Sequence, residues 1–536
     1  MADRRLTWPL TRCQQQMILS HTPRTHTESS KSCSEHASAH SEPLVPMLST
    51  NEPRTTRLGD VVTLPAYDRG LVTRNICIGG LVLSWLVSIA CIILARWTFR
   101  SGQLFRTQNG SYTHNGQGER VFFLSTVRQE LVKLAVNVCV SFCTDCLGYI
   151  HSASTPWALW REGRLLYNSN ARLLVSTRSC SSSRWSSNLV SAFLLIVCYV
   201  SSGQLFLSST SAEQKGFVLN GIAISALGIG ILGQAMVSTL CIWGSRQLIP
   251  TWSSNPLNTA LTCLHHGMRS VGGRCMLSVH QRDRPPIPSK PFHHQASAER
   301  AIPSIRHITR FLFASFGLIL VWTIAIRSDP YFRKNPSTTL PLYGASVPVL
   351  ELNLCSLLIT SSLQLLLTVS LHLTELLVNL SRDEHIWRLA TSKKGTQSSF
   401  GPLGSLKSAA CSWQTILLFT LKSLVYWLFG LAVNSNGQIV YMNWVGILLL
   451  FAGVGVVVVF GSLLAWSQPN GSQPATFGHL QTLADLIDEW HEGGETIRWG
   501  DKGLAKNSTI GGHKMIRHAG TTRTCLQGVR MRVSYQ

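Results

Sequence analysis

The sequence predicts an all-α fold, a polytopic bundle of transmembrane helices. Of the 536 residues, 45% are hydrophobic and only 13% are charged, whereas about a quarter of a soluble globular chain is charged. Several apolar runs exceed the length of about 18 residues that a helix needs to cross a bilayer. Lipid offers the backbone no hydrogen bonds, so such runs must be helical. The alternating segments of roughly 10 residues that build a transmembrane β-barrel do not occur.

Eight apolar segments are long enough to be spans, which would place both chain ends on one side. The last is the clearest, because Trp444 and Trp466 bracket a run of Gly, Val and Leu, as aromatic belts do at membrane interfaces. The second contains Lys133, Asn137 and Asp145, and if it lies on the surface instead, seven spans remain. The expected spans are 75–97, 130–150, 188–208, 217–243, 308–326, 347–373, 414–434 and 443–466.

Composition divides the rest of the chain into tails and loops. The first 57 residues are rich in Ser, Thr, His and Arg and hold few large apolar residues, so they cannot bury enough surface to offset the entropy lost on ordering. The expected organisation is a disordered cytoplasmic N-tail (1–74), a first group of four spans (75–243), a cytoplasmic basic loop (244–307), a second group of four spans (308–466) and a cytoplasmic C-tail (467–536).

The placement of the cysteines favours an orientation with both tails in the cytoplasm. Lys and Arg are about equally dense on the two sides, so the positive-inside rule does not decide the orientation. In this orientation Asn109, in Asn109-Gly110-Ser111, is a usable glycosylation site. None of the 15 cysteines lies in the loops that would face outside, where thiols oxidise, namely 98–129, 210–216, 327–346 and 435–442.

Polar residues inside the spans are costly to bury and are functional candidates by default. Four of them recur every four residues in the second span, so they share one helix face. Lys422 in the seventh span and Asp145 differ in depth by only about 4–5 Å at 1.5 Å per residue, and we predict that they pair. Glu351 in the sixth span is a possible partner for Lys133. The intramembrane candidates are therefore Lys133, Asn137, Ser141, Asp145, Glu351 and Lys422.

These polar residues allow a structural and a functional interpretation. Pairs of them would hold the helices in register, or Lys422 would extend alone to the headgroups. Alternatively they line a transport path, as intramembrane charges do in many transporters.

Glycine spacing suggests that the two groups of four spans are duplicated halves, as in many transporter folds. The alternative is that glycine is simply frequent in membrane helices, because small residues let backbones approach closely. The matching positions are Gly221, Gly228 and Gly230 with Gly446, Gly453 and Gly455, and Asn137, Cys139 and Thr144 with Asn353, Cys355 and Thr360.

The C-tail predicts an amphipathic helix over 476–492, with Thr476 as its N-cap. An acidic face would be repelled by anionic headgroups, so we expect it to bind the chain's own basic loops or a protein partner. Its apolar stripe is Leu480, Leu483, Ile487 and Trp490; its acidic face is Asp485, Asp488, Glu489 and Glu492; and the basic loop residues are Arg161, Arg164 and Arg172.

Several classes of function are disfavoured by the sequence. The formal charge of +22 is spread over many loops rather than one basic domain, so no nucleic-acid partner is expected. Cys263, His265 and His266, followed by Cys275 and His280, are of the types that bind zinc, but their spacing matches no closed finger pattern, so no metal is expected. The chain shows no P-loop, nucleophile elbow or metalloprotease motif, which favours a protein without catalytic residues or a cofactor.

Three regions of the chain carry a resemblance to known sequences. They are TDCLGYIHSASTPWALWREGRLLYNSNARLL (144–174), IPTWSSNPLNTALTCL (249–264), and QPATFGHLQTLADLIDEW (473–490) with RWGDKG (498–503) and RHAG (517–520). Together they resemble a group of large, uncharacterised multi-spanning membrane proteins of filamentous fungi. The resemblance implies a fungal integral membrane protein, with the bilayer as its partner, and assigns no activity and no functional residue.

Two functional classes follow from the sequence. The first is a membrane scaffold or sensor that acts through its cytoplasmic loops and tail. The second is a transporter or channel that uses the polar faces of the second, sixth and seventh spans. A transporter should contain a cavity at membrane depth lined by Asn137, Ser141, Asp145 and Lys422, whereas in a scaffold these groups should satisfy one another.

Overall fold

The computed structural model describes residues 64–101, 119–122, 126–208, 217–245, 248–328, 337–341, 349–399, 412–435, 439–492, 495–505 and 516–536. All helices and strands described below belong to one compact unit, Pro65–Gln536. The N-tail was predicted to be disordered over residues 1–74. Residues 1–63 lie outside the described residues, as does Asn109, but Asp68 O accepts hydrogen bonds from Thr251 and Asn258 and α2 begins at Leu71, so the end of this segment is ordered.

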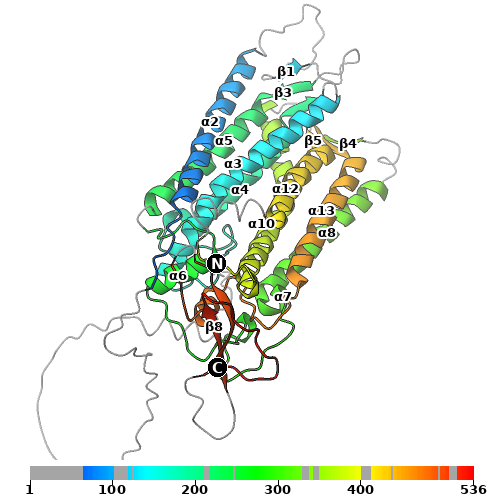
Figure 1. The fold of residues 1–536 in the computed structure, drawn as a ribbon. Helices are drawn as coiled ribbons and strands as arrows, with labels where there is room; N and C mark the ends of the chain where they lie inside the picture. Colours follow the sequence, from blue (N-terminus) through cyan, green and yellow to red (C-terminus); the bar gives the residue numbers. More distant parts are fainter. Residues whose placement is uncertain are drawn as a thin grey trace, which may run out of the picture. The chain divides into compact units, whose positions relative to one another are not determined.

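Eight long helices run side by side, one at each predicted span (Figure 1). Each is long and apolar enough to cross a membrane, which is consistent with a multi-pass membrane protein. They are α2 (Leu71–Ser101), α3 (Thr126–Arg161), α4 (Trp185–Gly203), α5 (Gly221–Ser245), α8 (Pro303–Ser328), α10 (Val349–Arg388), α12 (Trp413–Ala432) and α13 (Trp444–Trp466).

Large apolar side chains cover the outer surface of these helices. Leu86 and Ile93 of α2 are 60% and 63% exposed, and Val459 and Leu463 of α13 are exposed to a similar extent. Soluble proteins do not leave so many apolar side chains in water. Hydrocarbon is the solvent that suits this surface.

Short strands join the helices at one end of the bundle. They form two three-stranded antiparallel sheets, in the orders β1-β3-β2 and β4-β6-β5. The predicted spans 188–208, 217–243 and 414–434 were therefore too long at this end, where the chain is extended. The strands are β1 (Glu119–Phe122), β2 (Phe206–Ser208), β3 (Phe217–Asn220), β4 (Ser337–Pro341), β5 (Val433–Ser435) and β6 (Ile439–Asn443).

Asparagine caps explain where two of these strands give way to helices. The side chain of Asn220 accepts hydrogen bonds from the backbone N–H groups of Ile222 and Ala223. Asn443 accepts from Val445 and Gly446 in the same way. An N-cap satisfies donors that lack partners in the first helical turn, so α5 and α13 begin directly after these residues.

The two groups of four helices have the same internal arrangement. In the first, α5 packs on both α2 and α4; in the second, α13 packs on both α8 and α12. The two sheets are also inserted at equivalent places and share one strand order. This agreement supports the interpretation of the two groups as duplicated halves.

Equivalent residues meet where the halves touch. The rings of Tyr199 in α4 and Tyr426 in α12 stack with their centroids 3.6 Å apart. One turn further along, Gly203 and Gly430 face each other, and a Cβ added to either would lie in van der Waals contact, 3.5–3.6 Å from the other's Cα. Each helix thus contributes a Tyr-x-x-x-Gly segment to the contact, and glycine permits the close approach.

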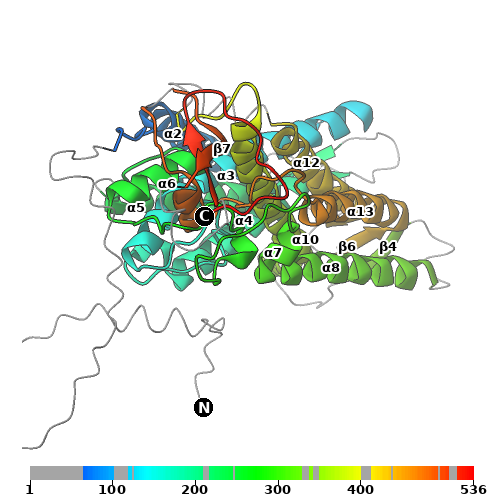
Figure 2. The same cartoon turned by 60° about the horizontal axis from the view of Figure 1, so that its bottom comes forward.

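The other end of the bundle carries a folded region, which we call the tail-side domain, made from described residues of 65–70, 162–184, 248–302, 389–399 and 467–536. Figure 2 shows β7 and α6 in front of the bundle when this end comes forward. Its elements are η2 (Ser181–Ser183), α6 (Pro256–His265), η3 (Val279–Gln281), α7 (Ala298–Ala301), η4 (Leu389–Thr391), α14 (Leu480–Leu486) and the antiparallel strands β7 (Arg498–Leu504) and β8 (Arg517–Thr522).

The predicted tail helix is much shorter than expected. It covers only Leu480–Leu486. Thr476 is not its N-cap, because its backbone N–H and its hydroxyl both bond to Glu384. Phe477 has a positive φ of 45°, which ends any helical path before His479, and the His479 side chain caps the helix by accepting from Thr482 N–H.

The acidic residues of this segment bind the chain's own basic groups, but not the arginines that the sequence suggested. Asp485 accepts from the backbone N–H of Val271 at 2.8 Å and lies 3.6 Å from Arg274. Asp488 pairs with Lys502 at 2.9 Å and with His518 at 3.0 Å. These partners lie in the basic loop and the β7–β8 hairpin, whereas Arg161, Arg164 and Arg172 lie elsewhere.

Candidate functional site

A buried ion cluster lies inside the helix bundle, centred on Lys422 of α12. The Lys422 Nζ lies 2.9 Å from Asp145 Oδ1 on α3 and 2.9 Å from Glu375 Oε2 on α10. Its side chain is only 5% exposed. The predicted pair of Asp145 and Lys422 is therefore confirmed, and it joins one helix from each half of the bundle.

Glu375 is a partner that the sequence did not reveal. The sixth span was expected to end at residue 373, two residues short of it, but α10 continues to Arg388. The Nδ1 atom of His372 lies 3.3 Å from the same carboxylate oxygen, one helical turn earlier. Burying an ion in a low-dielectric interior is tolerable only when partners surround it, and here one ammonium group is shared by two carboxylates.

The tyrosine pair between the halves lies next to this cluster. The hydroxyl of Tyr199 is 2.9 Å from Thr144 Oγ1, and Thr144 precedes Asp145 on α3. The cluster and the stacked rings therefore form a continuous polar and aromatic contact between α3, α4 and α12.

The other candidate residues of the second span lie nearer the N-terminal end of α3. Lys133 pairs with Glu130, one turn earlier on α3, at 2.9 Å. The predicted pairing with Glu351 is wrong, because this local partner takes the ammonium group and Glu351 is exposed. Asn137 donates to Lys133 O and accepts from Ser202 Oγ at 2.9 Å. Ser141 is fully buried on the same helix.

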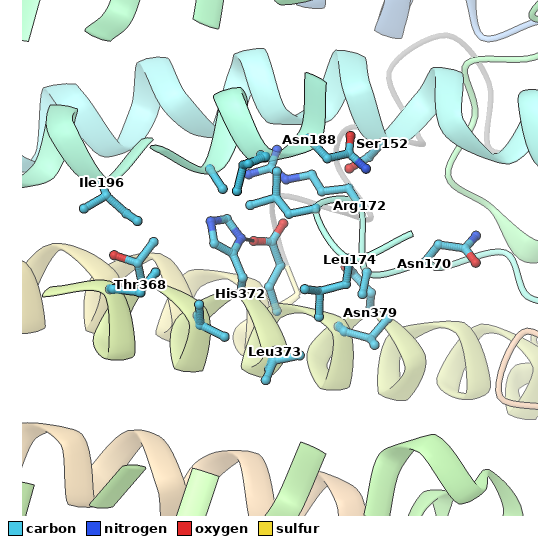
Figure 3. A pocket seen from close by; sticks show the side chains of 18 of the residues that line it. Ser152, Asn170, Arg172, Leu174, Asn188, Ile196, Thr368, His372, Leu373 and Asn379 are labelled. Carbon is cyan, nitrogen blue, oxygen red and sulfur yellow. Dashed lines mark ion pairs between the residues drawn. The ribbon is translucent and has the colours of Figure 1, made fainter. Parts of the chain in front are cut away.

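Beside the ion cluster, α4 and α10 enclose a cavity of about 230 Å³ that is covered by residues 170–174 (Figure 3). His372 and Glu375 line it, but Asn137, Ser141, Asp145 and Lys422 do not. Arg172 extends into the same region and is only 8% exposed. The cavity is mostly apolar, with a few polar groups near its tail-side end.

The tail-side end of α10 is held by the loop between α3 and α4. The carboxylate of Asp383 accepts from Asn168 Nδ2 at 3.0 Å and from Ser169 Oγ at 2.8 Å. Asn168 N–H donates in turn to Gly478 O at 2.9 Å. The residues that cover the cavity therefore belong to a loop tied both to α10 and to the C-terminal region.

The C-terminal region is also anchored on α10. Glu384 Oε2 accepts from the backbone N–H groups of Thr476 and Phe477, each at 2.8 Å. Trp387 is fully buried and donates from its indole N–H to Pro474 O. A single helix thus runs from the bundle into the core of the tail-side domain.

The β7–β8 hairpin is closed by a second carboxylate network. Asp501 on β7 accepts from Arg517 Nε at 2.8 Å and from the Tyr535 hydroxyl at 3.0 Å. A hydrogen bond from His518 to Asp488 is the main reason that the pKa of His518 is raised to about 10. Burial would raise the pKa of Asp488, but the bonds from His518 and Lys502 outweigh it and hold that pKa below its usual value. This region is therefore fixed by ion pairs of its own residues.

Among the described residues, no group of three or more His, Cys, Asp or Glu side chains is placed so that it could hold a metal ion. His265 and His266 contact residues 65–70 instead: His265 Nε2 lies 2.6 Å from Pro65 O, and His266 Nε2 lies 3.5 Å from the Tyr67 hydroxyl.

The fold and its sites together define a helical, multi-pass type of chain with a tail-side domain built around one extended helix. No family model, curated protein or solved structure matches it.

Proposed function

We propose that this chain is a membrane scaffold or sensor that acts through its tail-side domain. The observation that carries the proposal is the continuity of α10. It bears Glu375 and His372 in the bundle and, further along the same helix, Asp383 and Glu384 in the tail-side domain. A rigid helix of 40 residues is a physical connection between the two regions.

The state of the intramembrane polar groups supports this proposal over transport. Asp145 and Lys422 bond to each other, and Asn137 bonds to Ser202. The described cavity beside them is lined by none of the four side chains that were expected to line a transport path. The expectation for a scaffold is met by Asp145 and Lys422, whereas Ser141 Oγ is buried without a hydrogen-bond partner.

The proposal requires the bundle and the tail-side domain to be coupled. Hydrogen exchange of the full chain in lipid nanodiscs measures this directly, in wild type and in an Asp383→Asn variant. We expect Lys422→Met to raise exchange in residues 473–487 of the otherwise wild-type chain. In the Asp383→Asn background the added effect of Lys422→Met should be lost, since the helix no longer holds the loop.

Asp283→Asn is the matched control, because its side chain is 84% exposed on the surface of the same domain. It should leave the response to Lys422→Met unchanged. If Lys422→Met alters exchange only within the bundle, the two regions are not coupled and the proposed sensor is contradicted. Transport would be indicated instead by solute or proton flux in proteoliposomes that Lys422→Met abolishes.

A further inference from the structure

The cavity between α4 and α10 has most of its charged and amide side chains in its middle and toward the tail-side end, whereas Thr368 is the polar residue near Ile196 at the other end (Figure 3). Its α10 lining runs from Leu365 to Asn379, a length of about 21 Å at 1.5 Å per residue. Asn170, Arg172 and Asn379 lie toward the tail-side end, and Ile196 lies at the opposite end (Figure 3). This polarity matches that of a lipid whose headgroup lies at the interface and whose chain points toward the bilayer centre.

Arg172 is a buried cation with spare hydrogen-bonding capacity. Its Nε atom is buried and has no hydrogen-bond partner, and within the described residues no carboxylate lies within ion-pair distance of its guanidinium. Glu375 lines the same cavity and interacts electrostatically with Arg172, but its short contacts are with Lys422 and His372. A guanidinium has five N–H donors suited to a carboxylate or phosphate, so this one has donors left for a further anionic group.

The backbone of α3 leaves space for this arginine. A Cβ added to Gly148 would overlap the guanidinium of Arg172. The side chain is therefore seated against a glycine on α3, which holds its charged end beside the cavity rather than in solvent.

The cavity is bordered by side chains that face lipid. Leu189 of α4 and Leu365 of α10 both line it and are 54% and 47% exposed on the apolar surface of the bundle. Trp185 lines it at the first residue of α4, where an aromatic residue of the interfacial belt is expected. A ligand would thus enter sideways from the bilayer.

We propose that this cavity binds an anionic lipid with a single acyl chain. Arg172 binds the anionic headgroup, a carboxylate or a phosphate, and the chain lies between α4 and α10. The volume of about 230 Å³ suits part of one chain rather than two. This site goes beyond the proposed function, because it is argued from the cavity alone and does not depend on any coupling to the tail-side domain.

Equilibrium binding to the full chain, purified in a mild detergent, tests the proposal. The probes are radiolabelled oleate for the carboxylate and oleoyl lysophosphatidic acid for the phosphate, with oleyl alcohol as the neutral competitor. We expect at least one anionic probe to bind, and the alcohol to compete at least about tenfold more weakly, since loss of a charged hydrogen-bond partner costs a tenfold factor or more in affinity. The tighter probe identifies the headgroup.

Two variants separate the head site from the chain site. Arg172→Gln should weaken binding about tenfold or more, while Arg164→Gln, an exposed arginine of the same loop paired with Glu162, should not. Ala192→Trp fills the cavity wall on α4 and should abolish binding without removing a charge. This second variant decides the matter if Arg172→Gln does not fold.

Three results would overturn the site. The first is equal competition by the alcohol, which would show that charge plays no part. The second is unchanged affinity in a folded Arg172→Gln protein. The third is unchanged affinity in Ala192→Trp, which would place the probe elsewhere on the apolar surface.

Discussion

At the scale of single residues, the ion cluster contains one positively charged side chain and two negatively charged ones. One ammonium group, that of Lys422, serves both Asp145 and Glu375 at 2.9 Å. Removing the lysine leaves two carboxylates facing each other, whereas removing either carboxylate leaves one good pair. The three side chains are therefore unequal in their contribution to stability.

We predict that Lys422→Met is the most damaging neutral substitution in the cluster, at about 3–5 kcal/mol, because it strands two partly buried carboxylates. Asp145→Asn should cost clearly less, since Glu375 still pairs with the lysine and the Asp145 side chain is 33% exposed. Thermal unfolding in detergent measures both. Lys394→Met, at an exposed position of the tail-side domain, is the control and should change little.

Glu375 also changes the outcome expected for a charge swap. From the sequence alone, reversing both Asp145 and Lys422 should restore a lost pair. In the structure, an aspartate at position 422 would also face Glu375, and like charges at this distance repel. We therefore expect the double reversal to fold less well than wild type, and the same swap with Glu375→Gln added to recover more of the unfolding temperature. Recovery by the double reversal alone would contradict the shared-lysine geometry.

The pair of His518 and Asp488 makes part of the stability depend on pH. The pKa of His518 in the folded chain is about 10, above its ordinary value of 6.5. A raised pKa means that the stabilisation is complete below about pH 6.5 and is lost as the pH rises toward about 10. His518→Gln should lower the unfolding temperature most near pH 6 and hardly at all above pH 10. His385→Gln, at an exposed position, is the control for the loss of a histidine side chain.

At the scale of elements, the close contact between α4 and α12 is the point where the halves depend on glycine. Gly203 and Gly430 leave no space for a large side chain. The ring stack of Tyr199 and Tyr426 lies one turn away and fixes the same separation. The neighbours of each glycine here are backbone atoms, so a large side chain can be accommodated only if the two helices move apart.

We predict that Gly430→Leu destabilises the chain by about 1–3 kcal/mol, the usual cost of overpacking. Gly317→Leu on α8 is the matched control, because nothing lies within 4 Å of a Cβ added there. The unfolding temperature of each variant in detergent provides the comparison. Equal effects of the two substitutions would show that the glycine contact does not determine helix spacing.

The elements also show which features the sequence could predict. All eight spans were found because crossing a bilayer needs only length and apolar composition. The pair of Asp145 and Lys422, 277 positions apart, was found because depth alone limits which charges can meet. The predicted pairing of Lys133 with Glu351 was wrong, because the depth of a residue in the membrane does not tell which way its helix face points. Glu130, one turn away on the same helix, pairs with Lys133 instead.

Other features depend on contacts that no local pattern contains. The tail helix ends early because Thr476 bonds to Glu384, which lies 92 positions away. The cavity exists because residues 170–174 fold over α4 and α10. Buried glycines such as Gly148 have no distinct sequence signal, since their role is set by a side chain from another element.

At the scale of the whole molecule, the tails and even-numbered loops that contribute to the tail-side domain gather at one end of the bundle, opposite the two small sheets (Figure 1). Three segments of the C-tail also meet in this domain. RWGDKG and RHAG form the paired strands β7 and β8, and QPATFGHLQTLADLIDEW contains α14. Regions far apart in the sequence therefore build one surface at one end of the helix bundle (Figure 1).

We predict that this surface faces the cytoplasm, so that Asn109 is glycosylated and Asn470, in the tail-side domain, is not. Expression in a eukaryotic cell should give a glycosidase-sensitive shift in mobility that Asn109→Gln removes and Asn470→Gln does not. The reverse pattern would invert the orientation. The test is independent of every other prediction, because it reads only which side each sequon occupies.

The core of the tail-side domain draws on side chains from Leu165 to Tyr535, with Trp387 between them. Helices can enter the membrane one after another as the ribosome makes them, but this core cannot close until translation has passed Tyr535. Synthesis proceeds at about 5–20 residues per second. The apolar groups of the early loops therefore stay exposed for tens of seconds before the last part of the core has been made. The domain is therefore completed after the helices that precede it, because its core lacks side chains until Tyr535 has been made.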